Sequence, residues 1–169
     1  RSTRVLSMGA DLGAVVPRTR RGPGASARLL FVGRLVEKKG LAVLLDALRD
    51  VDTASYSLVV VGDGPLRAEL EALARGLPVT FAGQLGRAEL MQRYADSDVV
   101  VVPSVLAASG DQDGLPVALL EAMGSGCAII ASDLPGLNEA IQDQVSGLLV
   151  PSGDVDALRD GVAALVSDD

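Results

Sequence analysis

Short apolar runs recur along the chain and alternate with stretches of helical periodicity. The runs are rich in Val, Leu and Ile, and they end at Gly, Pro or Ser. A continuous apolar run of this length is typical of a strand that is buried on both faces of a parallel sheet. The runs predict six strands, over residues 28–33, 57–62, 79–83, 98–104, 127–132 and 147–150.

The stretches between these runs predict helices. Pro65 suits the start of one helix, and Asp154 is placed to cap the last one. The expected helices cover residues 40–50, 65–75, 86–95, 116–124 and 154–166, with a further short helix around 137–142. Alternating strands and helices form right-handed βαβ units, so we expect an α/β fold with one doubly wound parallel sheet of about six strands and helices on both faces. Ligands bind such a sheet beyond the carboxyl ends of its strands.

Composition restricts the core and the expected location. Hydrophobic residues make up 49% of the 169 positions, enough for one domain with a hydrophobic core, whereas aromatic residues make up only 2%. We therefore expect an aliphatic core.

No apolar run reaches the roughly 18 residues of a membrane span. The single cysteine, Cys127, allows no internal disulfide and is expected in the core. The sequence thus favours the cytoplasm and gives no indication of membrane association.

Charge is distributed unevenly. Residues 1–28 hold six Arg and one Asp, a net charge of +5, whereas the remainder carries −12. Nucleic-acid binding requires a basic surface, so the acidic remainder disfavours it. The basic segment 17–28 predicts a flexible linker.

The chain starts at Arg1, and we expect part of a longer protein, with 1–27 as an interdomain segment and linker and 28–169 as the folded domain.

Histidine is absent from the sequence. A Ser-His or Cys-His nucleophile system therefore cannot be built from this chain. A zinc site with histidine ligands is excluded as well, and a single cysteine cannot replace those ligands.

Two cations follow the first predicted strand. Gly33 is followed by Arg34, and Lys39 stands five positions further on, before the first helix. An Arg makes forked hydrogen bonds to phosphate and a Lys acts as a point charge, so the pair can bind a diphosphate. The alternative is an ordinary charged loop in which Glu37 pairs with one of the lysines.

Glycines follow the second predicted strand. Gly62 and Gly64 form G-x-G without the third glycine of a dinucleotide-binding fingerprint, which disfavours an NAD-dependent dehydrogenase. They predict a tight turn instead, one that can pass close to a ligand.

The stretch "DGLPVALLEAMGSG" contains two acids. Glu121 stands alone in an otherwise apolar helix, and a buried carboxylate needs a partner, which can be protein or ligand. Asp113 precedes Gly114 and can either cap the helix or contact a ligand. With Pro116 in the first helical turn, the N–H groups around Gly114 and Leu115 would face an anion.

The order of these motifs adds a resemblance. "FVGRLVEKKG", "VVVGDGPLR", "VTFAGQL", "DVVVVPS", "DGLPVALLEAMGSGCAIIASDLPGLNEAI" and "SGLLVPSGD" together resemble the nucleotide-sugar half of the family-four retaining glycosyltransferases. These enzymes have the GT-B architecture of two Rossmann-like domains. The resemblance covers nearly the whole chain, and residues 8–17 resemble the segment that leaves the family's N-terminal domain.

The resemblance implies roles for the site residues. Arg34 and Lys39 match the basic pair that binds the donor diphosphate, and the Glu-x7-Glu motif falls on Asp113 and Glu121. Glu121 would bind the ribose, and Asp113 would approach the donor sugar, although Asp stands where Glu is usual. The expected contacts with the rest of the donor involve Gly33, Gly62, Gln84 and Leu85 (the last two at the base), and Gly114, Leu115 and Pro116 at the sugar and phosphates.

The resemblance also implies an activity. The chain would be the donor-binding half of a hexosyltransferase that uses a UDP- or GDP-sugar as donor substrate, with no metal and no other cofactor. It would lack the N-terminal acceptor domain and would be inactive alone. The alternatives are a GT-B sugar-nucleotide epimerase and a non-catalytic nucleotide-binding domain.

Overall fold

The computed structural model describes residues 16, 22 and 24–167, and it contains one sheet of six parallel strands in the order β3-β2-β1-β4-β5-β6. The strands are β1 (Ala27–Val32), β2 (Tyr56–Val61), β3 (Val79–Gly83), β4 (Val99–Val102), β5 (Ala128–Asp133) and β6 (Leu148–Pro151). The chain adds β2 and β3 on one side of β1 and then crosses back to place β4 on its other side. The strand order therefore reverses between β1 and β4, which is the position where open α/β sheets bind ligands.

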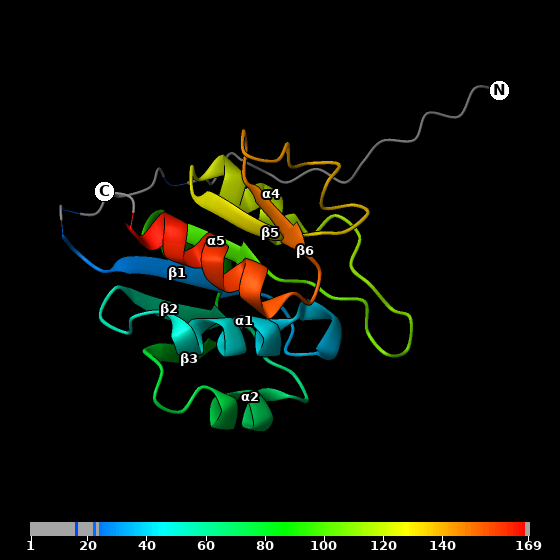
Figure 1. The fold of residues 1–169 in the computed structure, drawn as a ribbon, viewed down its shortest axis with the longest axis horizontal. Helices are drawn as coiled ribbons and strands as arrows, with labels where there is room; N and C mark the ends of the chain where they lie inside the picture. Colours follow the sequence, from blue (N-terminus) through cyan, green and yellow to red (C-terminus); the bar gives the residue numbers. More distant parts are fainter. Residues whose placement is uncertain (1–15, 17–21, 23, 168–169) are drawn as a thin grey trace.

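Helices cover both faces of this sheet, as the sequence predicts. The helices are α1 (Leu41–Ala47), α2 (Arg67–Leu73), α3 (Arg87–Ala95), α4 (Val117–Gly124) and α5 (Val155–Ser167), with two 3-10 turns, η2 (Glu37–Lys39) and η3 (Leu48–Asp50). One core cluster joins the sheet to α1, α2 and α5, and the other joins it to α3 and α4. Figure 1 shows α1 and α5 in front of the strands. The Rossmann-like α/β prediction is confirmed.

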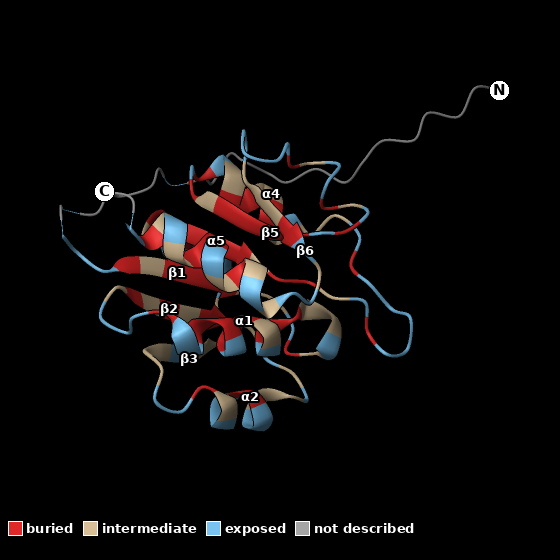
Figure 2. Cartoon of the chain, in the orientation of Figure 1, coloured by how far each residue is buried: buried red, intermediate tan, exposed pale blue. Residues whose placement is uncertain are grey.

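The two core clusters explain why the strands are continuously apolar. Leu29 and Phe31 of β1 belong to the cluster under α1 and α5, whereas Leu30 between them belongs to the cluster under α3 and α4. Side chains alternate across a strand, so a sheet covered on both faces needs apolar residues at every position. Figure 2 shows the same arrangement, with buried strands between helices whose outer faces are exposed.

Several expected boundaries hold. Each predicted strand is present to within two residues, and Asp154 caps α5 because its Oδ1 accepts the backbone N–H of Ala157 at 2.9 Å. The structure corrects three details. The short helix expected around 137–142 is a series of turns, preceded by Gly136 at φ +93°. Pro65 lies in a turn two residues before α2, and Pro116 is the N-cap of α4 and not its first helical residue.

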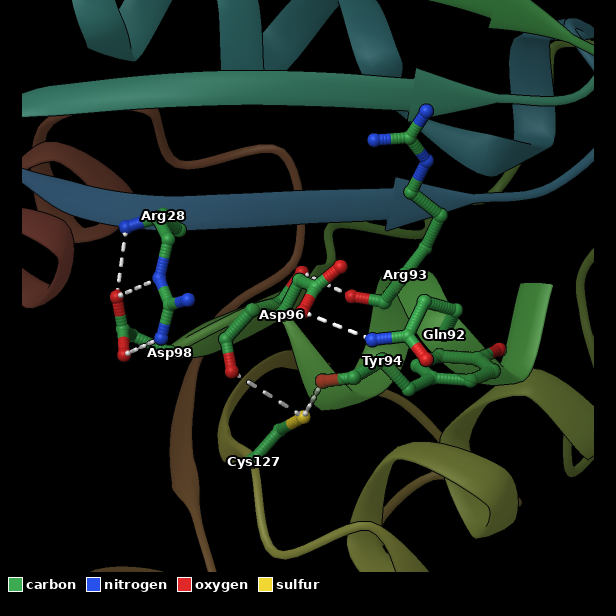
Figure 3. A network of polar contacts seen from close by, with 8 residues as sticks. Arg28, Gln92, Arg93, Tyr94, Asp96, Asp98 and Cys127 are labelled. Atoms are coloured by element: carbon green, nitrogen blue, oxygen red, sulfur yellow. Dashed lines mark hydrogen bonds and ion pairs between the residues drawn. The ribbon is translucent and has the colours of Figure 1, made fainter. Parts of the chain in front are cut away.

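Arg28 joins the amino ends of β1 and β4 (Figure 3). Its backbone N and Nε donate to Asp98 Oδ2 at 2.9 and 3.0 Å, and its Nη2 donates to Oδ1 at 2.9 Å. The hydrogen bond with Asp98 raises the pKa of the Arg28 guanidinium above its ordinary value. Ala27 and Arg28 therefore belong to the sheet, while half of the linker 17–28 and the segment 8–17, except Val16, lie outside the described residues.

Replacing Asp98 should therefore destabilise the fold. Asp98→Ala removes charge-assisted hydrogen bonds to Arg28, and we expect the free energy of unfolding to fall by about 1.5–3 kcal/mol. Asp96→Ala is the matched control, because Asp96 lies nearby and accepts only from Gln92 Nε2, at 3.0 Å, among the contacts that Figure 3 draws for its side chain. Urea denaturation measures the free energy of unfolding of both variants. Equal losses for the two variants would show that the Arg28 pairing contributes nothing specific.

Cys127 is buried, as expected for a core residue. Its Sγ donates to the backbone oxygen of Tyr94 at 3.2 Å, and its side chain packs in the cluster under α3 and α4 (Figure 3). This contact ties the start of β5 to the end of α3.

Candidate active site

Two loops meet at the carboxyl ends of β1 and β4. The first, residues 33–40, follows β1, and the second, residues 103–116, follows β4, which is its neighbour in the sheet. Together they enclose a hollow of about 430 Å³. Its lining is polar in large part and consists of Arg34, Val36, Glu37, Lys38, Lys39, Ala107, Ser109, Asp111 and Asp113. The sequence-predicted residues Arg34, Lys39 and Asp113 are thus brought together.

Asp113 is held by the loop opposite to its own. Its side chain is only 7% exposed, and Lys39 Nζ lies 2.7 Å from its Oδ2. Ser104 Oγ donates to the same oxygen at 2.9 Å. Lys38 Nζ is 3.8 Å from the other oxygen, Oδ1. The carboxylate is therefore fixed through Oδ2, whereas Oδ1 has one more distant cation.

The alternative role of Asp113 as a helix cap is wrong. The N-cap of α4 is Pro116, and no side chain of the described residues makes a capping hydrogen bond there. Since the first helical residue is Val117, the N–H groups at the start of α4 belong to Val117 and the residues after it. Gly114 and Leu115 therefore precede the helix and do not supply its end N–H groups, and their contact with an anion stays a prediction.

A second ion pair connects the two loops. Lys38 Nζ lies 3.0 Å from Asp111 Oδ2 and donates to its Oδ1 at 3.2 Å, and this bond raises the pKa of the Lys38 ammonium. Glu37 does not pair with a lysine, because its Oε1 accepts the backbone N–H of Ala108 at 3.0 Å. The charged-loop alternative was therefore wrong about Glu37, although the lysines do have acidic partners.

Arg34 differs from the two lysines. Its side chain lines the hollow and is exposed, and it makes no ion pair or hydrogen bond with another residue in the described part of the chain. Its guanidinium is therefore available to an anion without first leaving a partner among these residues.

The glycines after β1 and β2 are explained by backbone packing. Gly33 N donates to Val61 O at 3.0 Å, and Gly62 N donates to Gly83 O at 2.8 Å. Gly62 has φ +133°, and a Cβ there would overlap the carbonyl of Gly33. The turn begins at Gly64, whose backbone oxygen accepts the N–H of Arg67 at 3.1 Å, and not at Gly62 as expected; Gly62 instead packs against Gly33, at the start of the loop that carries Arg34. A donor contact at Gly33 or Gly62 stays a prediction.

Glu121 has protein partners. Its side chain is 6% exposed, and its Oε1 accepts from Arg87 Nη1 at 2.8 Å. Its Oε2 accepts from the hydroxyl of Tyr94 at 3.4 Å, and burial together with the charge of Glu121 raises the pKa of that hydroxyl. The partners of the lone acid of α4 are therefore two residues of α3, Arg87 and Tyr94. Contact with a ribose stays a prediction.

Sequence reasoning did not find Arg87 and Tyr94. The available signal is their spacing: they stand seven positions apart on α3, so they lie on the same face of that helix. A second signal is that Arg87 is the first residue of α3, where the helix dipole disfavours a positive charge.

The remaining predicted residues lie in the loops after β3 and β4. Gln84 is exposed directly after β3, and Leu85 packs partly buried against the cluster under α3 and α4, two residues before Arg87. Leu115 packs against the same cluster. Gly114 is exposed and lies against Gly136, where an added Cβ would be 3.0 Å from the carbonyl carbon of Gly114. The loop after β5 thus adjoins the site.

The comparisons with known proteins decide the family. The family model described as glycosyl transferases group 1 matches residues 26–168. The chain belongs to this family. The resemblance inferred from the ordered motifs is confirmed.

Individual relatives support this result. The chain is 39% identical over 137 residues to the amylovoran biosynthesis glycosyltransferase AmsK of Erwinia amylovora, a match that covers 78% of this chain and 34% of AmsK. Among solved structures, the lipopolysaccharide outer core galactosyltransferase WaaB superposes with a TM-score of 0.81 at 25% identity, covering 97% of this chain and 46% of WaaB. The chain thus spans about a third of the length of AmsK and less than half of WaaB.

A third relative matches over most of its own length. The C-terminal domain of the group 1 protein LpcC of Francisella tularensis superposes with a TM-score of 0.75 at 25% identity, covering 95% of this chain and 89% of that domain. A domain of this family is therefore known as a separate folded unit.

Two further features are absent from the described residues. Within that part of the chain, no helix is both long enough and apolar enough to cross a membrane. The same residues contain no group of three or more His, Cys, Asp or Glu side chains arranged to hold a metal ion.

Proposed function

We propose that this chain is the donor-binding domain of a retaining glycosyltransferase that transfers a hexosyl group from a nucleotide-diphosphate sugar to an acceptor. The observation that carries the proposal is the hollow between the loops after β1 and β4, where Arg34 and Lys39 stand beside the buried Asp113. Cations at the switch point of a parallel sheet suit a diphosphate.

In this proposal each group of residues binds a different part of the donor. Arg34 and Lys39 bind the diphosphate and stabilise the negative charge that develops on it as the sugar leaves. An ammonium has three donors, so Lys39 can keep its contact with Asp113 while it binds a phosphate oxygen. Asp113 faces the sugar and Glu121 binds the ribose, with Gln84 and Leu85 at the base.

The alternatives receive less support. The relatives are named as glycosyltransferases, which favours sugar transfer over the epimerase. A non-catalytic binding domain would not need an acid beside the diphosphate cations, whereas Asp113 is fixed there by Lys39 and Ser104. Retention of configuration, independence of metal, a UDP- or GDP-sugar as donor and a cytoplasmic location stay predictions.

A ligand panel tests the proposal. Thermal unfolding of the 169-residue chain is measured with UDP, GDP and ADP and with their glucose or mannose conjugates. A ligand that binds only the native state at about a hundred times its dissociation constant stabilises it by about 2.7 kcal/mol, so one base should raise the melting temperature clearly. If no nucleotide diphosphate raises it, the donor-binding role is wrong.

The same chain should bind a donor without transferring sugar. Transfer requires an acceptor held in line with the donor and water kept away, and we assign both tasks to a separate N-terminal acceptor domain. Incubating the chain with the donor identified in the panel and with simple sugar acceptors should therefore give no glycoside product by mass spectrometry. Measurable transfer would show that residues 1–169 form a complete active site.

A further inference from the structure

Helix α3 contributes a cation to the carboxylate of α4. Arg87 is the first residue of α3, and its Nη1 donates to Glu121 Oε1 at 2.8 Å. The Arg87 side chain is half exposed, at 49%, whereas the Glu121 side chain is 6% exposed. One group therefore faces the solvent while the other is buried, and the charged hydrogen bond between them compensates the carboxylate for its lost hydration.

The two oxygens of Glu121 are held separately. Oε1 accepts from Arg87, and Oε2 accepts from the hydroxyl of Tyr94, which is buried in the core under α3 and α4. Two protein donors on different oxygens fix the plane of the carboxylate. A carboxylate has about four lone-pair positions, so two hydroxyl groups of a ligand can still donate to it.

The position of Arg87 costs helix stability. The positive end of the helix dipole lies at the first turn, where an acid is favourable and a cation is unfavourable. Glu89, in the same turn, follows this rule, since its Oε2 accepts the N–H of Gly86. The charge of Arg87 is therefore not explained by α3 itself, and its contact with Glu121 supplies the explanation.

We propose that Arg87 is a positioning residue for the donor: it holds the Glu121 carboxylate in one orientation, so that the two hydroxyls of the donor ribose can bind it together. This inference rests on the proposed function, because it assigns a ribose to Glu121. Arg87 acts through Glu121 and not on the diphosphate, which belongs to Arg34 and Lys39. We therefore expect that removing the Arg87 guanidinium weakens the binding of ligands that contain a ribose and not the binding of a diphosphate alone.

Calorimetric titration with two probes tests this role. The nucleotide diphosphate that the chain prefers, UDP or GDP, contains the ribose, whereas inorganic pyrophosphate contains only the charged part. Arg87→Met should weaken nucleotide binding by about tenfold, as expected for losing one hydrogen bond to a charged group, and should leave pyrophosphate binding unchanged. Arg87→Lys keeps the charge and should recover part of the loss. Arg93→Met, on the exposed part of the same helix, is the matched control and should leave both unchanged.

A double-mutant comparison shows whether Arg87 acts through Glu121. If it does, Arg87→Met combined with Glu121→Gln should bind nucleotide no more weakly than Glu121→Gln alone. Additive losses would overturn the inference, and so would unchanged nucleotide binding in Arg87→Met. Equal weakening of nucleotide and pyrophosphate would indicate general damage and also overturn it.

The controls separate this inference from the proposed function. Thermal unfolding is recorded for each variant, and Arg87→Lys carries the test if Arg87→Met does not fold. A wild-type chain that binds neither nucleotide would refute the donor-binding role and this inference with it. A chain that binds nucleotide equally well with and without the Arg87 guanidinium would refute only the role of Arg87.

Discussion

Arg34→Ala is expected to weaken binding of the nucleotide diphosphate by about tenfold or more and to leave nucleoside binding nearly unchanged. The loss corresponds to a charge-assisted contact of about 1.5–3 kcal/mol. The guanidinium lines the hollow and has no partner among the described residues, so its removal should not change the melting temperature of the free chain. Titration with UDP or GDP and with the matching nucleoside measures the selectivity. Arg75→Ala, an exposed arginine in the loop after α2, is the control.

Lys39→Ala should produce the same loss of affinity together with a loss of stability. The ammonium pairs with Asp113 in the free chain, and that carboxylate is 7% exposed. Without Lys39, Asp113 keeps Ser104 and the more distant Lys38, so we expect the free energy of unfolding to fall by about 1–3 kcal/mol. If both variants weaken nucleoside and nucleotide diphosphate equally, the pair does not bind the diphosphate.

The second large effect separates the two acids of the α4 motif. Glu121→Ala is expected to weaken free nucleotide and nucleotide-sugar alike, by about tenfold or more, because both contain the ribose. Asp113→Ala should weaken only the nucleotide-sugar, because the proposed function places Asp113 at the sugar, and its carboxylate pairs with Lys39 and not with Arg87. The measured quantity is the ratio of the two dissociation constants for each variant.

The ion pairs of Glu121 and Asp113 determine which measurement can separate their roles. Both acids have cationic partners, so each alanine variant should also lower the melting temperature, and stability alone does not distinguish their roles. The affinity ratio does. If Asp113→Ala leaves the ratio at its wild-type value, Asp113 serves only to join the two loops, and the sugar contact is wrong.

The strands and the faces of the sheet follow from local chemistry. Leu29, Leu30 and Phe31 are consecutive apolar residues, and only a strand covered on both faces buries all three. The cap at Asp154 depends on atoms three residues apart, so it is also visible in the sequence. The short helix at 137–142 was wrong: the segment forms turns, and Gly136 before it packs against Gly114, a tertiary contact that local propensity does not include.

The side-chain pairs of the site depend on distant segments. The motif order located Lys39 and Asp113, but their contact requires β1 and β4 to be neighbours, which the alternating pattern alone does not fix. Arg87 was missed because its place at a helix start and its spacing from Tyr94 do not identify a partner, and that partner lies 34 residues away on another helix. Sequence motifs therefore identified the acids and cations, and the fold determined how they pair.

The separation of the two site loops along the chain bears on the order of folding. Lys38 and Asp111, which join these loops, are 73 residues apart, with β2, β3 and their helices between them. Closing so long a loop costs chain entropy, so the pairing of β4 with β1 is expected to come after the local βαβ contacts. Nucleotide binding would then appear only when the last long-range contacts have formed. A bound nucleotide should slow unfolding and leave the folding rate unchanged, provided that the hollow is absent from the transition state.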